Sequence, residues 1–352
     1  MREFLDRQGV DAVIIADPYN MRHISGFSGG EGYVYVSRDK KIIITDSRYT
    51  EATTKEAKQG FEVIESSVTK SDIEIIKDLS ISDNAKCIGF EDLFLTCALY
   101  GRIIGTCGFE SMKPLAESVN DLRIIKEPWE IDNLRMAESI GDKAFLDILN
   151  YIKPGVTELQ IAAELEYSMK KHGAERLSFD SIVASGANSS LPHAVPSAKV
   201  VCEGDFLTMD FGCTYNGYCS DMTRTVVVGN ASDKQREIYD TVLKAQLEAM
   251  KAIHSGVMGK DIHNIAAGVI AAAGYGSYFG HGLGHSVGLY IHENPRFSAV
   301  ENRAIMAGTI ETVEPGIYIP DFGGVRIEDM IVVTEDGYDN LTNSPKELIE
   351  IK

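Results

Sequence analysis

Residues 206–228 read FLTMDFGCTYNGYCSDMTRTVVV, and this stretch decides the fold. Two runs within it, residues 206–213 and 218–228, have the apolar and β-branched character of strands. They flank Asn216-Gly217, the preferred residue pair of a two-residue type I′ turn. The stretch therefore predicts a tight β-hairpin.

The turn fixes the register of this hairpin and, with it, the positions of two carboxylates. Closing the turn pairs the two tyrosines that flank it and places Asp210 opposite Thr223. Because side chains alternate along a strand, Asp210 and Asp221 become diagonal neighbours on one face. Carboxylates inside a strand lose hydration unless a positive group meets them. We therefore expect the two acids to lie within reach of a shared cation.

The last third of the chain repeats landmarks of the middle third in the same order. By this internal symmetry, Glu314 corresponds to Asp210 and Glu328 corresponds to Asp221. Coincidence among common residues is the alternative, but the shared order favours two duplicated helix-and-hairpin halves around a pseudo-two-fold axis. The other matching landmarks are Gly155-Val156 with Gly256-Val257, Lys143-Ala144 with Lys244-Ala245, and His193-x-x-Pro196 with His292-x-x-Pro295.

Four carboxylates gathered in this way require positive charge. They cannot all stay ionised at close range, and two divalent cations would compensate them. Residues 280–285, GHGLGH, predict a tight loop that brings an imidazole to the carboxylates, because Gly282 and Gly284 argue against a helical histidine pair. Four oxygen donors and one imidazole favour Mn²⁺ or a similar ion over a thiolate-binding one, with zinc left open.

The composition excludes other classes of protein. The chain has 352 residues, a length typical of two domains. Its formal net charge of −18 repels phosphate backbones, and no basic stripe offsets it, so we expect no nucleic-acid partner. Residues 262–292 lack charged side chains other than histidine, but glycines and histidines interrupt them. They predict a helix followed by a glycine-rich loop rather than a membrane span.

Cysteine usage points to a reducing compartment. The six cysteines form no C-x-x-C pair, and the first residues mix charges where a secretory signal would need an apolar run. Scattered cysteines in a long chain without a signal favour free thiols. We therefore expect a cytoplasmic protein without a membrane partner.

About the first 120 residues alternate strand and helix patterns, which predicts a mixed α/β sheet domain. Pro128 then opens a long amphipathic helix, so we expect two domains, residues 1–122 and 123–352. The expected strands of the first domain are residues 10–16, 33–36, 42–45, 61–64 and 88–90, and its expected helices are residues 49–59, 71–79 and 93–104.

Several short segments keep the order and spacing of one known family. They are Leu191-Pro192-His193, Met209-Asp210-Phe211-Gly212, Ser220-Asp221-Met222-Thr223-Arg224-Thr225, residues 280–285, His292-Glu293-Asn294-Pro295, Val313-Glu314-Pro315-Gly316-Ile317-Tyr318 and Val325-Arg326-Ile327-Glu328-Asp329. With them, residues 120–352 resemble the pita-bread metallopeptidases, and the whole chain resembles their Xaa-Pro branch, aminopeptidase P and prolidase. The resemblance implies an α+β fold: a pita-bread (creatinase/aminopeptidase-like) C-terminal domain with an internal pseudo-two-fold repeat, preceded by a smaller mixed α/β, ribonuclease H-like domain.

The resemblance also implies roles for the polar residues. Two divalent metal ions, Mn²⁺ first with Co²⁺ or Zn²⁺ as alternatives, would be bound by Asp210, Asp221, His285, Glu314 and Glu328. Substrate would be contacted by His193, His281, His292 and Arg326, of which Arg326 would also brace the site. Two residues depart from the family pattern: Ser286 replaces a glycine, and Leu283 replaces a smaller or β-branched residue. We expect these two to reshape the rim of the pocket.

The expected reaction is hydrolysis of the Xaa-Pro bond at the N-terminus of a peptide. A hydroxide held between the two metals would attack the scissile carbonyl, because coordination lowers the pKa of water towards neutrality. Glu314 would take a proton and pass it to the leaving nitrogen, while His193 and His292 would stabilise the tetrahedral intermediate. The expected partners are small peptides with proline at the second position and a second copy of the chain in a homodimer. We also expect the N-terminal domain to close over the site.

Three alternatives compete with this interpretation. A methionine aminopeptidase would use the same five ligands, but that group resembles the C-terminal part alone. Creatinase-type amidinohydrolases share the long layout and lack the metal set. A catalytically inert pita-bread binding module would have lost ligands or histidines, and none is missing here. Assays of Met-Ala-type against Xaa-Pro substrates, with and without Mn²⁺, distinguish these possibilities.

Overall fold

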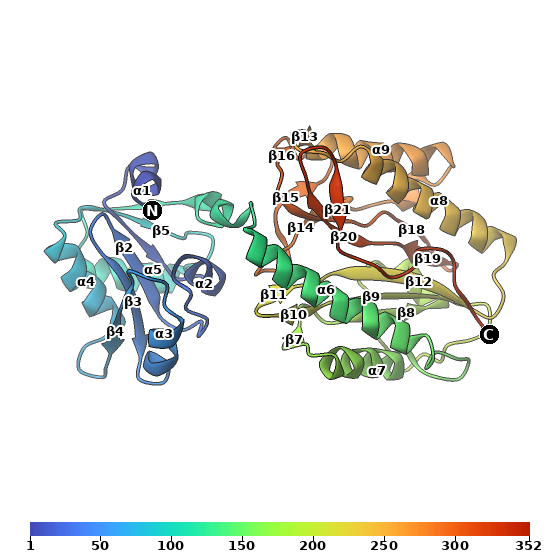
Figure 1. Ribbon diagram of the computed structural model, residues 1–352, viewed down its shortest axis with the longest axis horizontal. Coiled ribbons are helices and arrows are strands. Elements are labelled where there is room, and N and C mark those ends of the chain that lie inside the picture. The colour runs from blue at the N-terminus through green and yellow to red at the C-terminus, as the bar shows by residue number, and fades with distance from the viewer. The chain divides into compact units, whose positions relative to one another are not determined.

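The computed structural model describes residues 1–352 and divides them into two compact units, Met1–Arg123 and Ile124–Lys352 (Figure 1). Each unit contains hydrophobic clusters of its own. All six cysteines are free, which confirms the prediction from their spacing. None of the helices combines the length and the apolar character that a membrane crossing requires.

The first unit is built on one mixed sheet. Its strands are β1 (Ala12–Ile15), β2 (Tyr33–Ser37), β3 (Lys41–Asp46), β4 (Glu62–Ser66), β5 (Cys87–Phe90) and β6 (Ser111–Pro114), and its helices are α1 (Arg2–Gln8), α2 (Pro18–Ser25), α3 (Thr50–Glu56), α4 (Asp72–Ser82) and α5 (Cys97–Cys107). The strand order is β4-β3-β2-β1-β5-β6. Both faces of the sheet are buried, because alternate residues such as Val13 and Ile14 enter different clusters.

The five predicted strands of this unit are present, but three elements were not predicted. Helices α1 and α2 are short, and β6 has no apolar run because Met112 is its only partly buried residue. The helix expected to begin at residue 93 begins at Cys97 instead. The reason is a cap: the Thr96 hydroxyl accepts a hydrogen bond from the Leu99 N–H.

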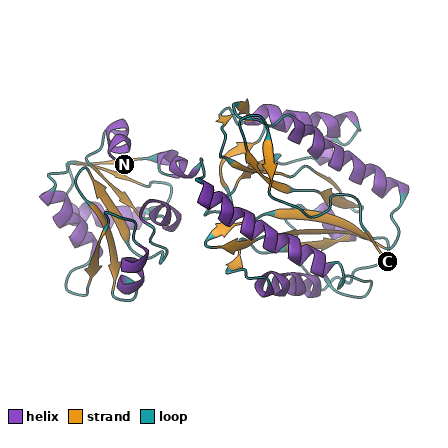
Figure 2. Cartoon of the chain, viewed as in Figure 1, coloured by secondary structure: helices purple, strands orange, loops and turns teal.

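The second unit contains two helix pairs and several short sheets (Figure 2). Its helices are α6 (Pro128–Ile148), α7 (Glu158–Lys171), α8 (Asp233–Lys251) and α9 (Gly259–Ala272). Its strands are β7 (Arg176–Leu177), β8 (Ile182–Ser185), β9 (Phe206–Phe211), β10 (Cys213–Tyr215), β11 (Tyr218–Cys219), β12 (Met222–Val228), β13 (Val257–Met258), β14 (Gly284–Ser286), β15 (Glu293–Phe297), β16 (Ala304–Ile305), β17 (Ile310–Val313), β18 (Gly316–Ile319), β19 (Gly323–Arg326), β20 (Asp329–Val333), β21 (Tyr338–Asn340) and β22 (Glu350–Ile351).

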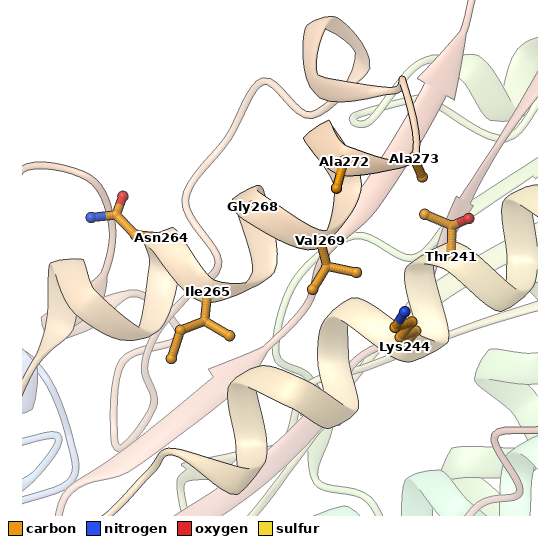
Figure 3. Close-up of a pocket in the computed structure, with 8 residues that line it drawn as sticks. All are labelled: Thr241, Lys244, Asn264, Ile265, Gly268, Val269, Ala272 and Ala273. Carbon is orange, nitrogen blue, oxygen red and sulfur yellow. The ribbon is translucent and has the colours of Figure 1, made fainter.

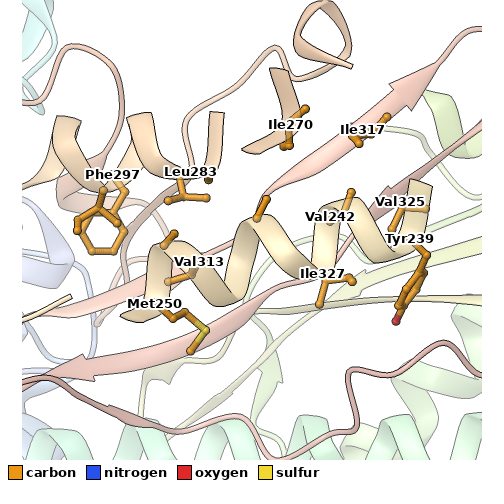
Figure 4. Packing of buried hydrophobic residues seen from close by; sticks show 14 of the residues in the cluster. Tyr239, Val242, Met250, Ile270, Leu283, Phe297, Val313, Ile317, Val325 and Ile327 are labelled. Carbon is orange, nitrogen blue, oxygen red and sulfur yellow. The ribbon is translucent and has the colours of Figure 1, made fainter. Parts of the chain in front are cut away.

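Each helix pair of the second unit buries its apolar face against strands. Helices α6 and α7 share a cluster with β8, β9 and β12. Helices α8 and α9 share another with β17, β18, β19 and β20, in which Val242 and Ile270 accompany Val313 and Ile327 (Figure 4). Pro128 begins α6, as the sequence predicts, and α7 and α9 end at Lys171 and Ala272, shortly before Gly173 and Gly274.

The first hairpin has the predicted register. Tyr215 pairs with Tyr218, and Asp210 pairs with Thr223. The turn residues have the positive φ angles of a type I′ turn, 45° at Asn216 and 72° at Gly217. This part of the fold is therefore set by local turn chemistry.

The second hairpin departs from the symmetry in one respect. Val313 pairs with Asp329 and Gly316 pairs with Arg326, so Glu314 and Glu328 face each other directly between these two ladders. The corresponding acids of the first hairpin are diagonal neighbours. The second pair of carboxylates is thus brought together more tightly than the internal repeat predicts.

The predicted glycine-rich loop is partly a strand. Residues 284–286 form β14, which pairs with β15, and His285 lies in this strand rather than in a loop. Gly284 is needed here because a Cβ at this position would lie 1.9 Å from the Thr312 carbonyl oxygen on β17. The close approach of the two strands carries the imidazole towards Glu314.

Candidate metal centre

The four predicted acidic ligands come from the ends of strands. Asp210 lies on β9, and Asp221 lies immediately before β12. Glu314 lies between β17 and β18, and Glu328 lies between β19 and β20. Asp221 and Glu328 are only 4% and 2% exposed, and Asp210 and Glu314 are mostly buried. Carboxylates are rarely buried to this degree without a compensating charge.

The fifth predicted ligand, His285, completes the group. Its Nε2 atom lies 3.4 Å from Asp221 Oδ2 and 3.6 Å from Glu314 Oε1. The ligand atoms of Asp221, His285 and Glu328 all lie within 4.8 Å of one another. The structure therefore brings these groups into the range in which one ion contacts several of them.

Hydrogen bonds hold three of the carboxylates in place. Arg326 Nη2 donates to Asp210 Oδ2 at 2.5 Å, and Arg326 Nε donates to Thr223 Oγ1 at 2.9 Å. The Thr223 hydroxyl in turn donates to Glu328 Oε2 at 2.6 Å. Thr312 Oγ1 lies 3.2 Å from Glu314 Oε1. One buried guanidinium thus orients Asp210 directly and Glu328 through a hydroxyl.

Burial and mutual repulsion both disfavour the ionised forms of the carboxylates in the cluster. Burial raises the pKa of Asp221 and of Glu328 well above the usual range, and the neighbouring carboxylates raise each further. Burial also raises the pKa of Glu314 to about 8, although Arg326 opposes the shift. For His285, burial lowers the pKa to about 3, so this imidazole is neutral and free to act as a ligand.

The donor set fits a divalent cation. Asp210 Oδ1 is buried and has no hydrogen-bond partner, although Oδ2 of the same carboxylate is held by Arg326. Buried polar atoms are normally paired, so an unpaired oxygen that lies among carboxylates indicates a missing positive partner. Hard oxygens with one neutral imidazole suit Mn²⁺, Co²⁺ or Zn²⁺.

Three further histidines lie around the cluster and differ in their contacts and exposure. His292 lies against His285, with ring centroids 4.6 Å apart. His281 is held at both nitrogens, since Nδ1 lies 2.7 Å from the Gly282 carbonyl and Nε2 lies 3.0 Å from the Tyr318 hydroxyl. His193 is exposed and directly follows Pro192, whose carbonyl lies 3.3 Å from Arg326 Nη1. The three therefore share one site.

Some residues of the site were not predicted from the sequence. Arg326 Nη1 donates to the Tyr318 hydroxyl at 2.8 Å, so Tyr318 connects Arg326 with His281. Thr223 and Thr312 each bind a predicted ligand through a hydroxyl. A signal was available for the threonines, because each lies two residues from a predicted ligand and shares its strand face. Tyr318 lies within the segment Val313–Tyr318 that resembles the family, but that resemblance assigned it no role.

The two residues expected at the pocket rim lie elsewhere. Leu283 and Ser286 are fully buried, so this expectation is wrong for both. Leu283 packs in the cluster of α8 and α9. The Ser286 hydroxyl accepts a hydrogen bond from Lys126 Nζ at 3.2 Å, and the same ammonium forms a buried ion pair with Glu293 at 3.1 Å. The serine therefore binds a buried cation that a glycine would not reach.

A separate groove of about 570 Å³ lies between α8 and α9 (Figure 3). Thr241, Lys244 and Asn264 contribute its polar groups, and Ile265 and Val269 line it with apolar surface. It contains none of the predicted site residues and no pair of acidic or histidine side chains. The carboxylate cluster remains the candidate site.

Comparisons with known proteins match both units of the chain. Residues 132–335 match the model of metallopeptidase family M24, and residues 1–125 match that of the creatinase/prolidase N-terminal domain. An uncharacterized peptidase of Bacillus subtilis (strain 168) is 45% identical over 349 residues, which cover 99% of this chain and 98% of that protein. The Xaa-Pro dipeptidase of Pyrococcus furiosus is 40% identical over 348 residues, which cover 99% and 97%.

Solved structures show the same architecture. The Xaa-Pro dipeptidase from Bacillus anthracis superposes with a TM-score of 0.96 at 42% identity, covering 99% of this chain and 97% of that chain. The X-Pro aminopeptidase from Thermotoga maritima superposes with a TM-score of 0.93 at 37% identity, covering 99% and 100%. The predicted pita-bread fold with a smaller N-terminal domain is confirmed.

Proposed function

The chain belongs to metallopeptidase family M24, and from that premise we propose that it hydrolyses the Xaa-Pro bond at the N-terminus of short peptides. Membership of this family makes it a metal-dependent hydrolase. The observation that carries the proposal is the buried group of Asp221, His285 and Glu328 with two further carboxylates beside it. The names of two similar proteins, an Xaa-Pro dipeptidase and an X-Pro aminopeptidase, support the choice of substrate.

We assign two divalent cations to this centre. They would be held by Asp210, Asp221, His285, Glu314 and Glu328, and Mn²⁺ is the proposed ion, with Co²⁺ and Zn²⁺ as alternatives. When bound, such ions lower the pKa of a coordinated water and polarise the scissile carbonyl.

Glu314 is proposed to carry the proton of the reaction. Its Oε1 atom lies 3.6 Å from His285 Nε2, within the group of proposed ligands. A carboxylate in this position accepts a proton from the attacking water and then returns it to the leaving nitrogen. The hydrogen bond between Thr312 and Glu314 holds the carboxylate in one orientation during both transfers.

The histidines are proposed to contact the substrate. His292 and His193 would donate N–H hydrogen bonds to the scissile carbonyl oxygen, on which negative charge develops in the transition state. Donors that are already oriented stabilise this charge without the cost of reorganisation. His281 has both ring nitrogens occupied, so it would orient the substrate through its ring rather than through a nitrogen. Arg326 would act mainly by fixing Asp210.

The preference for proline has a physical rationale. A proline nitrogen carries no N–H, so an Xaa-Pro bond gives nothing to a protease that binds its substrate as a strand. A site that reads the free N-terminal amine and activates the carbonyl avoids this need. The acidic cluster attracts such an amine.

The remaining assignments are proposals of the same kind. We propose a homodimer, and a functional division of the chain at residues 122 and 123. The six free cysteines support a reducing, cytoplasmic location. Light scattering checks the oligomeric state, and elemental analysis of protein purified without added metal identifies the ion.

One substrate panel tests the proposed function. The chain is stripped with a chelator, reloaded with Mn²⁺, Co²⁺ or Zn²⁺, and assayed on Xaa-Pro dipeptides, Xaa-Pro-Yaa tripeptides and Met-Ala-type peptides. We expect metal-dependent cleavage of the Xaa-Pro bond, lost in Glu328→Gln and kept in Glu335→Gln, which changes an exposed carboxylate of the same unit. Preference for Met-Ala peptides would instead indicate a methionine aminopeptidase, and inactivity with every metal would indicate a binding module.

A further inference from the structure

The loop that carries His193 is held at both of its ends by one buried carboxylate. Residues 186–196, called here the His193 loop, follow β8, and its only regular part is a short 3₁₀ turn at Gly186–Ser190. Leu191, His193 and Val195 are exposed along its tip. Glu158, in the first turn of α7, lies underneath and is completely buried.

Both oxygens of Glu158 accept hydrogen bonds from the residues that bound this loop. Before it, the Ser185 N–H and hydroxyl donate to Oε1 at 2.7 and 2.9 Å. Within its first turn, the Asn188 amide lies 3.1 and 3.2 Å from the two oxygens. After it, the Ser197 N–H and hydroxyl donate to Oε2 at 3.2 and 2.7 Å. A single side chain thus joins the two ends.

The charge of Glu158 depends on these donors. No cationic side chain forms an ion pair with it; the nearest contact with a cation runs through the Ser185 hydroxyl, to which Lys199 donates at 2.7 Å. A buried carboxylate without such compensation is costly, and hydrogen bonds to a charged acceptor are about twice as strong as neutral ones. The ends of the loop therefore cannot drift without leaving a buried charge unsatisfied.

The other contacts of the His193 loop do not replace this one. Its first part is tied to β19, because the Gly324 N–H donates to Ser189 Oγ at 2.8 Å, and Arg326 Nη1 lies 3.3 Å from the Pro192 carbonyl. Beyond His193, the first side-chain hydrogen bond is the one from Ser197 to Glu158. After the histidine, main-chain hydrogen bonds from the Leu159 N–H to the Ser197 carbonyl and from the Glu158 N–H to the Lys199 carbonyl, both 3.1 Å, also hold the chain. The Glu158 carboxylate adds the hydrogen bonds that join Ser197 to the start of the loop.

The loop that carries His292 uses a similar device with a different partner. There the Tyr290 N–H donates to Glu293 Oε1 at 3.2 Å, and Lys126 pairs with Oε2 of the same carboxylate. Each histidine-bearing loop therefore ends at its own buried acid. Glu293 has the Lys126 ammonium as its positive partner, whereas the Glu158 carboxylate accepts hydrogen bonds only from the loop and the residues that flank it.

We propose that Glu158 is a positioning residue that holds His193 at the substrate. The inference rests on the proposed function, because it takes His193 to contact the reacting carbonyl. It makes no demand on the metal ligands, which Glu158 does not touch. A displacement of His193 by as little as 1 Å would weaken catalysis by roughly 10- to 100-fold without loss of metal.

A double-mutant cycle tests the proposal. Glu158→Gln, His193→Ala and the double variant are compared by kcat/KM on an Xaa-Pro dipeptide, with metal content measured for each. We expect Glu158→Gln to lower kcat/KM at least several-fold and to have no further effect once His193 is removed. In the His292→Ala background its effect should persist in full. Equal losses in both backgrounds would overturn the proposal and leave Glu158 a purely structural residue, as would unchanged kinetics of the single variant.

Two further variants keep the test decisive. Glu166→Gln, on the same helix and without a hydrogen bond to the His193 loop, is the matched control and should retain wild-type kinetics. If Glu158→Gln fails to fold, Ser197→Ala removes one end of the connection and enters the same cycle.

Amide hydrogen exchange separates this inference from the proposed function. Glu158→Gln should accelerate exchange within residues 186–198 while the amides of β9 and β12 stay protected. Absence of Xaa-Pro cleavage by the wild-type chain would refute the proposed function. Unchanged exchange of the loop amides in Glu158→Gln would refute the positioning role, whatever the activity of the wild-type chain.

Discussion

The side-chain amide of Gln246 donates a hydrogen bond to the main-chain carbonyl of Val313 at 3.0 Å, directly before Glu314. The same nitrogen donates to the carbonyl of Ile327 at 3.3 Å, directly before Glu328. Gln246 is fully buried on α8. One amide therefore sets the spacing of the two strands that deliver two of the predicted ligands.

We expect Gln246→Leu to weaken the metal centre as well as the fold. Leucine fits the volume but leaves two buried carbonyls without this donor, which costs about 1–3 kcal/mol. Thermal unfolding and titration with Mn²⁺ measure the two effects, and Glu248→Leu, at a half-exposed position of the same helix, is the control. A variant with lower stability but unchanged metal affinity would contradict the role assigned to this amide.

Glu314→Gln should reduce turnover by roughly 10²- to 10⁴-fold, because the amide cannot accept and return a proton. The measurement is kcat on an Xaa-Pro dipeptide at full metal occupancy, verified by elemental analysis. Glu335→Gln serves as the exposed control. A kcat near the wild-type value in a metal-loaded variant would show that another group carries the proton.

Removal of the metal should destabilise the second unit. Without cations, the carboxylates of Asp221, Glu314 and Glu328 are left buried beside one another. A ligand present at 1,000 times its dissociation constant stabilises the folded state by about 4 kcal/mol. We expect a chelator to lower the Tm and fresh Mn²⁺ to restore it, with a much smaller response in Glu328→Gln. Equal responses of both proteins would argue against this ligand set.

The stability of the first unit should fall as the pH rises. Glu91 is 4% exposed and accepts hydrogen bonds from the N–H groups of Ala16 and Asp17, yet burial raises its pKa from 4.5 to about 7. Because the folded pKa is the higher one, its stabilisation is present below pH 4.5 and is lost as the pH rises through about 7. The change amounts to roughly 3 kcal/mol.

Hydrogen exchange of the β1 and β5 amides at pH 5 and pH 8, corrected for intrinsic rates, measures how the stability of the first unit changes with pH in the intact chain. Glu91→Gln removes the titrating group and should flatten it. Persistence of the full slope in this variant would mean that another group of the first unit is responsible.

Local chemistry explains which parts of the fold could be predicted. Asn216-Gly217 selects one turn type and thereby the register of Asp210, and Pro128 marks a helix start. The register of the second hairpin was not predictable in this way, because its turn has no comparable signature and the internal repeat identified Glu314 and Glu328 without fixing how they pair. His285 was expected in a loop because glycines disfavour helices, but the close approach of β14 to β17 requires Gly284 in a strand.

The supporting residues of the site were harder to find than its ligands. Gln246 carried a signal, because it is a polar residue on the apolar face of α8 that includes Val242 and Ala249. Glu158 carried none, since a glutamate in the first turn of a helix ordinarily interacts with the helix dipole on the surface. Its function depends on a loop that returns to it some thirty residues later, and only tertiary structure reveals that contact.

The buried pair of Lys126 and Glu293 determines where the chain tolerates truncation. A fragment that starts at α6 or at the first residue matched by the metallopeptidase model would discard this lysine. The acid would then remain enclosed with no cation, a loss worth about 3–5 kcal/mol in comparable buried pairs. A stable fragment that contains only the second unit must therefore begin before Lys126, so that it keeps this ion pair.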